Sequence, residues 1–213
     1  MAVAVKICGL NDSASVRAAV NGGAAMVGFV FFARSPRYVT PARQATLAAE
    51  VPPGVLKVGL VVDADDAMLD DLLAQARLDM LQLHGLENIE RVEAIRARYG
   101  LPVMKAVAIS GFKDIMLARD YETVADRLLF DARPPEGATR PGGNATAFDW
   151  LLLKDQSWRK PWLLAGGLNA DNLAQAVAAS GARAVDVSSG VEDRPGVKNP
   201  EKIQRFLAIA RAL

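Results

Sequence analysis

Residues 162–190 read WLLAGGLNADNLAQAVAASGARAVDVSSG and contain the unit from which the fold is inferred. Trp162–Ala165 and Ala184–Val187 are short apolar runs, as expected of strands that are buried on both faces. Between them, Asp171–Ala179 has the spacing of a helix with one apolar face. Two strands joined by a helix form a βαβ unit, which predicts that the strands are parallel.

The same alternation extends over the whole chain, and it predicts eight strands. The other six apolar runs are Val3–Ile7, Met26–Phe31, Leu56–Val62, Met80–Leu83, Pro102–Val107 and Arg127–Phe130. The other segments with helical spacing are Asp12–Val20, Pro41–Glu50, Asp66–Ala76, Glu87–Arg98, Phe112–Ala118 and Pro200–Ala212, with a short helix at Phe148–Leu153. Eight such units predict an α/β fold, a single-domain (β/α)8 TIM barrel over residues 1–213. A doubly wound open sheet is the alternative, but no Gly-x-Gly-x-x-Gly motif follows the first strand.

The composition excludes several classes of protein. A hydrophobic fraction of 51% in 213 residues is too high for a disordered chain, and a net charge of +1 gives no polycation for nucleic acid. One Cys and one His exclude an intrachain disulfide framework and a Cys/His zinc site. The longest apolar stretch is half of the roughly 20 residues that a membrane helix needs, and Met1–Lys6 lacks the features of a secretory signal. We expect a cytoplasmic protein with no metal and no nucleic-acid or membrane partner.

Polar residues occur at the ends of several predicted strands. In a TIM barrel the carboxyl ends of the strands carry the active site, and alternate residues of a strand share a face. We expect one face to hold Lys6, Cys8, Gln82, His84, Lys105, Asp131, Asp186 and Ser188. Because buried charges need partners or solvent, this face predicts the mouth of a polar pocket. Lys6 and Lys105 fit structural ion pairs as well as functional groups, and His84 fits a hydrogen-bonded core residue as well as a substrate contact.

Two turns near the C-terminus predict a phosphate site. Gly166 and Gly167 follow one strand, and Ser188–Gly190 follow the next. TIM barrels commonly hold phosphate between the loops after strands seven and eight, using backbone N–H groups and hydroxyls. After the second strand, Arg34 and Arg37 are both candidates to bind a substrate carboxylate, and their spacing does not distinguish them.

The sequence resembles the phosphoribosylanthranilate isomerase family at motifs that occur in the family's order. These are VKICGL at 5–10, VGFVFF at 27–32, SPRYV at 35–39, QLHG at 82–85, GG at 142–143, FDW at 148–150, LAGGL at 164–168 and DVSSGV at 186–191. With KNPEKI at 198–203, the resemblance covers nearly the whole chain.

This resemblance implies an isomerase of tryptophan biosynthesis that interconverts an aldose and a ketose. The implied reaction is a cofactor-free Amadori rearrangement of N-(5'-phosphoribosyl)anthranilate to 1-(2-carboxyphenylamino)-1-deoxyribulose 5-phosphate. By their places in the motifs, Cys8 matches the general base, Asp131 the general acid and Arg37 the residue that binds the anthranilate carboxylate. The remaining expected contacts are His84 and Asp186 with the substrate, and Gly166, Gly167, Ser188, Ser189 and Gly190 with its phosphate. We expect a monomer or a homodimer.

The chain departs from the family pattern in one segment. Residues 132–147 form a long loop without periodicity, and loops of this length are usually functional. Where the family often has Gly and Lys, this loop has Ala145 and Thr146, which leaves open how Asn144–Thr146 acts in closure.

Two alternatives remain at this stage. One is another phosphosugar barrel, either indole-glycerol-phosphate synthase or the histidine-pathway isomerase, although Cys8 in place of an Asp argues against the latter. The other is a barrel that binds a phosphorylated metabolite without turnover.

Overall fold

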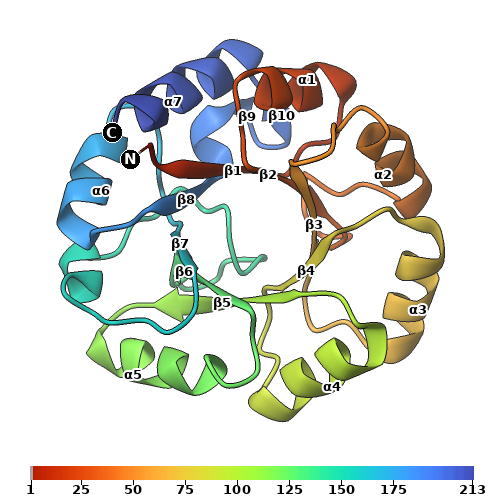
Figure 1. Ribbon diagram of the computed structural model, residues 1–213, viewed down its shortest axis with the longest axis horizontal. Helices are drawn as coiled ribbons and strands as arrows, with labels where there is room; N and C mark the ends of the chain where they lie inside the picture. Colours follow the sequence, from red (N-terminus) through yellow and green to blue (C-terminus); the bar gives the residue numbers. More distant parts are fainter. Residues whose placement is uncertain (1) are drawn as a thin grey trace.

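Eight parallel strands close into a barrel in the computed structural model, which describes residues 2–213 (Figure 1). The strands are β1 (Ala4–Cys8), β2 (Met26–Val30), β3 (Leu56–Val61), β4 (Met80–Leu83), β5 (Val103–Ile109), β6 (Arg127–Ala132), β7 (Trp162–Leu164) and β8 (Ala184–Val187). β1 pairs with both β2 and β8, and this closure confirms the barrel and excludes the open sheet. At the seam Lys6 is in register with Asp186.

Helices form a ring outside the barrel. They are α1 (Ser13–Asn21), α2 (Pro41–Ala48), α3 (Asp66–Gln75), α4 (Ile89–Tyr99), α5 (Phe112–Tyr121), α6 (Leu173–Ser180) and α7 (Pro200–Ala212). Between β6 and β7, the long loop and a 3-10 turn, η1 (Trp150–Leu153), stand in place of a longer helix. No helix within residues 2–213 is long and apolar enough to cross a membrane.

Local sequence explains where the helices begin. The Asp12 side chain accepts a hydrogen bond from the Ser15 N–H at 2.9 Å, which satisfies one free donor of α1. Thr40 precedes α2, and Pro41 occupies its first position, where the missing N–H costs nothing. The two ends of the chain meet where the Val3 N–H donates to the Ala210 carbonyl.

Alternate residues of the strands divide into two cores. One set packs against the helices, as Ile7, Leu81 and Phe130 do. The other set fills the barrel interior and consists of Met26, Val58, Met80, Met104, Ala106, Leu129, Leu163 and Ala165. These apolar side chains fill the interior beneath the carboxyl ends of the strands, where the polar side chains lie.

Lys105 corrects one expectation. It alternates with Met104 and Ala106 of the interior, so it points outward toward the helices instead of sharing the face of Lys6 and Cys8. Its Nζ donates to Glu87 Oε2 and to the Gly85 carbonyl, both at 2.7 Å. The predicted face of Lys105 was wrong, because outward positions of β5 were expected to be apolar, whereas the alternative of a structural ion pair is confirmed by its pairing with Glu87.

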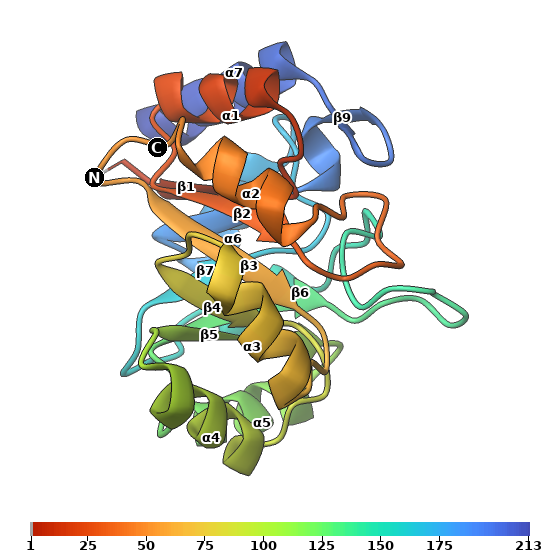
Figure 2. The ribbon, with the colours of Figure 1, turned by 90° about the vertical axis from the view of Figure 1, so that its right-hand side faces the viewer.

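A second difference lies after β8. A 3-10 turn, η2 (Ser189–Val191), leads into an antiparallel hairpin of β9 (Glu192–Arg194) and β10 (Val197–Lys198), which the sequence did not predict. Figure 2 shows this hairpin and the loop between β6 and β7 at the same end of the barrel. That end is where the carboxyl ends of the strands lie.

Candidate active site

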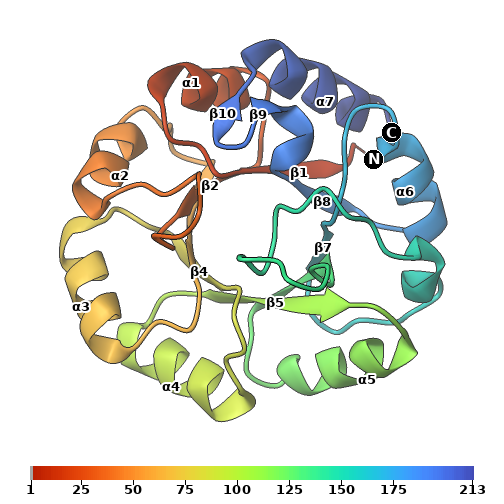
Figure 3. The same ribbon diagram turned by 180° about the vertical axis from the view of Figure 1, so that it is seen from behind.

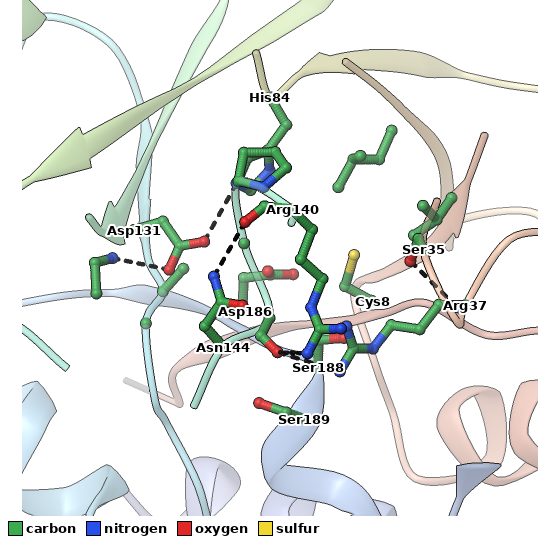
Figure 4. A pocket seen from close by; sticks show the side chains of 18 of the residues that line it. Cys8, Ser35, Arg37, His84, Asp131, Arg140, Asn144, Asp186, Ser188 and Ser189 are labelled. Atoms are coloured by element: carbon green, nitrogen blue, oxygen red, sulfur yellow. Dashed lines mark hydrogen bonds and ion pairs between the residues drawn. The ribbon is translucent and has the colours of Figure 1, made fainter. Parts of the chain in front are cut away.

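Four strands direct polar side chains into one pocket at the carboxyl end of the barrel. Cys8 comes from β1, Asp131 from β6 and Asp186 from β8, while His84 directly follows β4 (Figure 4). Arg37 also lines the pocket, whereas Arg34 is exposed outside it. The choice between the two arginines, which their spacing left open, therefore falls on Arg37.

Lys6 and Asp186 form a buried ion pair beneath Cys8. The Lys6 Nζ donates to Asp186 Oδ1 at 2.8 Å, and Lys6 has no exposed surface. Burial lowers the pKa of Lys6, but attraction to Asp186 and Cys8 outweighs it, so the pKa is raised and the ammonium stays charged. Lys6 is thus part of an ion pair whose two charges also shift the pKa of the Cys8 thiol.

Burial raises the pKa of the Cys8 thiol. The Lys6 charge opposes this rise, and the Asp186 carboxylate adds to it. Gly28 on β2 provides the space for this group, because a Cβ there would lie 3.0 Å from both Cys8 Sγ and Lys6 Nζ. The charge on Lys6 therefore favours the thiolate form of Cys8, and burial favours the neutral thiol.

Asp131 is held by two donors on the other side of the pocket. The Ala132 N–H donates to Asp131 Oδ1 at 2.8 Å, and His84 Nε2 lies 3.2 Å from Oδ2. The Gln82 amide lies 2.8 Å from His84 Nδ1. With that amide donating to Nδ1, the neutral ring carries its proton on Nε2 and directs it at Asp131.

Arg37 is almost completely buried, with 3% of its surface exposed. Its Nε and Nη2 donate to the two oxygens of Glu192 at 2.7 and 2.8 Å. Lys198 donates to the same carboxylate at 2.8 Å and to the Ser188 carbonyl at 2.9 Å. Burial would raise the pKa of Glu192, but the hydrogen bond from Arg37 and the charge of Lys198 lower it.

The predicted phosphate loops lie side by side. Gly166, Gly167, Ser188 and Ser189 line the pocket, and both glycines have the positive φ angles that glycine adopts readily. Gly190 is placed differently, because a Cβ there would collide with the Leu168 carbonyl oxygen. It lets the two loops pack directly on each other, and a contact of Gly190 with phosphate stays a prediction.

The loop between β6 and β7 passes over the pocket, and Figure 3 shows it reaching over the centre of the barrel. A Cβ at Gly142 would lie 2.8 Å from Asp131 Oδ2, and one at Gly143 would overlap Arg37. Farther along, a Cβ at Gly167 would lie 3.0 Å from the Ala147 nitrogen. The loop thus touches the carboxyl, the guanidinium and the phosphate loops in turn.

The sequence did not identify four residues of this site. Pro195-Gly196 was a local signal for the turn between Glu192 and Lys198. The role of Glu192 had no local signal, because its partner Arg37 is 155 positions before it. Arg140 lies in an aperiodic loop that also contains Arg133, and the sequence alone does not show which of the two arginines faces the pocket. Gly28 stands in an apolar strand, where an interior glycine is a known sign of close approach.

The pocket brings together a thiol, a carboxyl group, a guanidinium group and two glycine- and serine-containing turns. Val30, Leu60, Phe32 and Val62 form an apolar wall next to Cys8, and all four line the pocket. An aromatic ring fits such a wall, and Arg37 beside it suits a carboxylate on that ring. No group of three or more His, Cys, Asp or Glu within residues 2–213 is arranged to hold a metal ion.

Comparisons with known proteins identify one family. The sequence model described as N-(5'-phosphoribosyl)anthranilate (PRA) isomerase matches residues 5–208. The chain is 57% identical over 211 residues to the N-(5'-phosphoribosyl)anthranilate isomerase of Paramagnetospirillum magneticum, covering 99% of this chain and 98% of that one. It is 56% identical over 214 residues to that of Rhodospirillum centenum, with complete coverage of both.

Solved structures agree with the sequence comparison. The phosphoribosyl anthranilate isomerase of Thermotoga maritima superposes with a TM-score of 0.88 at 36% identity, covering 99% of this chain and 100% of that one. A phosphoribosyl anthranilate isomerase in complex with reduced 1-(o-carboxyphenylamino)-1-deoxyribulose 5-phosphate gives a TM-score of 0.84 at 34% identity, with the same coverage.

Proposed function

The chain belongs to the N-(5'-phosphoribosyl)anthranilate isomerase family, and from this premise we propose how its pocket performs the Amadori rearrangement of tryptophan biosynthesis. Asp131 is the general acid, Cys8 is the general base, and Arg37 binds the anthranilate carboxylate. Gly166, Gly167, Ser188 and Ser189 bind the phosphate, and Asp186 and His84, which line the same pocket, contact the substrate. The whole chain, residues 1–213, acts as one barrel domain without a cofactor.

The reaction is a sequence of proton transfers within one molecule. Asp131 protonates the furanose ring oxygen, the bond from that oxygen to C1 breaks, and the nitrogen lone pair forms an iminium. The Cys8 thiolate removes the proton from C2, and the electrons of that bond form an enolamine. C1 then gains a proton and the C2 hydroxyl loses one, which gives the ketone with no net change in atoms.

His84 and Gln82 support the acid. When Asp131 holds the proton, its O–H donates to His84 Nε2, and the ring must then carry its proton on Nδ1. Gln82 Oε1 is buried without a hydrogen-bond partner in the part of the chain described here, and rotating the amide would offer it to Nδ1. The Gln82 amide can therefore complete the hydrogen bonds of His84 both when Asp131 is protonated and when it is ionised.

The observation that carries the proposal is the placement of Cys8 and Asp131 around one pocket with an apolar wall and Arg37. An acid and a base are needed on different sides of the sugar, and general acid–base groups each contribute about 10²–10⁴-fold. A phosphorylated and carboxylated substrate crosses a bilayer only at high cost, so we also propose a cytoplasmic location. All the named groups come from one chain, and the proposal holds for a monomer or a homodimer.

The test is turnover of N-(5'-phosphoribosyl)anthranilate by the purified protein, followed by the fluorescence of the anthranilate group. The proposal predicts a loss of substrate fluorescence whose initial rate is proportional to the protein concentration. A stable signal at saturating binding would contradict it, because it would indicate a protein that holds the phosphosugar without converting it.

A further inference from the structure

Arg140 provides a second guanidinium group in the pocket that Arg37 lines (Figure 4). Its Nη2 donates to the Gly143 carbonyl at 3.2 Å, and Arg37 Nη2 donates to the same oxygen at 3.4 Å. Two cations from separate segments therefore converge on one neutral acceptor. Sharing a single carbonyl oxygen places the two nitrogens within about 7 Å of each other, close enough for one small anion to contact both.

The charges of these two arginines are compensated differently. Arg37 is paired with Glu192 at 2.7 Å. Arg140 has no carboxylate within ion-pair distance among residues 2–213, and its Nε is buried there without a hydrogen-bond partner. The loop's other cation, Arg133, is paired with Asp114 at 2.7 Å. A buried, unsatisfied donor on a cation is unfavourable, so this arrangement fits a site that an anion completes.

We propose that Arg140 binds the carboxylate of the substrate together with Arg37. Arg37 already uses Nε and one N–H of Nη2 on Glu192, so only its far edge remains for a ligand. A carboxylate has two oxygens with several lone pairs and accepts from two guanidinium groups at once. One oxygen of the carboxylate then accepts hydrogen bonds near the point where both guanidinium groups now donate to the Gly143 carbonyl.

The carboxylate is favoured over the phosphate by the path of the loop. Arg140 and Gly143 lie beside Arg37, whereas the later residues Thr146 and Ala147 are the ones against Gly167 in the phosphate loops. The apolar wall that suits the aromatic ring packs with Cys8 and lines the same pocket as both arginines. A carboxylate attached to that ring therefore falls between the two arginines.

This inference rests on the proposed function, and its test uses two ligands that differ only in the carboxylate. One is reduced 1-(o-carboxyphenylamino)-1-deoxyribulose 5-phosphate. The other is the corresponding compound with an aniline ring, which lacks the carboxylate. Their dissociation constants are measured by titration calorimetry for the wild type, Arg140→Met, Arg140→Lys and Arg133→Met. Arg133→Met is the matched control, since it removes a paired cation from the same loop.

We expect Arg140→Met to weaken binding of the carboxylated ligand about tenfold or more and that of the aniline ligand less than about twofold. Arg140→Lys, which keeps the charge without the planar fork, falls between wild type and Arg140→Met. Arg133→Met leaves both constants near the wild-type values.

Equal losses for the two ligands would overturn the assignment, because Arg140 would then bind the phosphate or only shape the loop. No loss for either ligand would overturn it as well. Turnover of N-(5'-phosphoribosyl)anthranilate by the wild type is measured in parallel. If turnover is absent, the proposed function fails; if it is present while the two ligands respond alike, only the assignment of Arg140 fails.

Discussion

Arg37 and Glu192 form a two-point ion pair in the wall of the pocket, with Nε–Oε1 and Nη2–Oε2 distances of 2.7 and 2.8 Å. The pair fixes the plane of the guanidinium and leaves one edge of it toward the pocket. Lys198 links the same carboxylate to Ser188 in the phosphate loops. One acidic side chain thus links Arg37, the proposed carboxylate-binding residue, to the loop that we propose binds the phosphate.

The first prediction concerns Glu192→Gln. The amide removes the charge that orients Arg37 and Lys198, so we expect KM to rise about tenfold, about 1.4 kcal/mol of binding, with kcat within about threefold. Asp193→Asn is the control, because that neighbouring pair with Lys202 is exposed. A fall in kcat at constant KM would contradict a positioning role. Thermal unfolding of both variants identifies any loss caused by misfolding.

The second prediction concerns the space beside the thiol. Gly28→Ala places a Cβ about 3 Å from Cys8 Sγ and Lys6 Nζ and must displace one of them. We expect kcat to fall about tenfold or more, since a small misplacement of a catalytic group is costly. Gly111→Ala is the matched control, because its backbone is extended and a Cβ there meets nothing within 4 Å. Equal kinetics of the two variants would show that the thiol does not need its present position.

The third prediction uses Cys8 as the chain's only cysteine. Because burial raises the pKa of Cys8, alkylation by iodoacetamide should rise with pH through a midpoint above the usual value of about 8.5. The base must be deprotonated, so kcat/KM should increase over the same alkaline range.

The sign of the Asp186 effect gives a sharper check. Its carboxylate raises the pKa of Cys8, so Asp186→Asn should lower that pKa and speed alkylation at pH 7.5, even as kcat/KM falls through lost substrate contacts. The measurement is made well below the Tm of the variant, because Asn leaves the Lys6 charge buried without its partner. An unchanged or higher midpoint of Cys8 alkylation would show that the Asp186 carboxylate does not raise the pKa of the thiol.

Much of the fold follows from the sequence because its signals are local. Apolar runs of strand length alternate with capped helices, and alternation along β1 and β8 places Lys6, Cys8 and Asp186 on one face. The outward direction of Lys105 was missed because the compensating Glu87 belongs to a different loop. Pairing across the barrel, such as that of Glu192 with Arg37, depends on the closed structure and has no local pattern.

The central claim is that Cys8 and Asp131 carry out the chemistry and contribute little to binding. The most direct measurement is kcat for N-(5'-phosphoribosyl)anthranilate and Kd for the reduced product, determined together for Asp131→Asn and Cys8→Ala. We predict that each substitution lowers kcat at least about 100-fold while Kd changes less than about threefold. Unchanged kcat in either variant, or a loss accompanied by an equal loss of binding, would contradict the account.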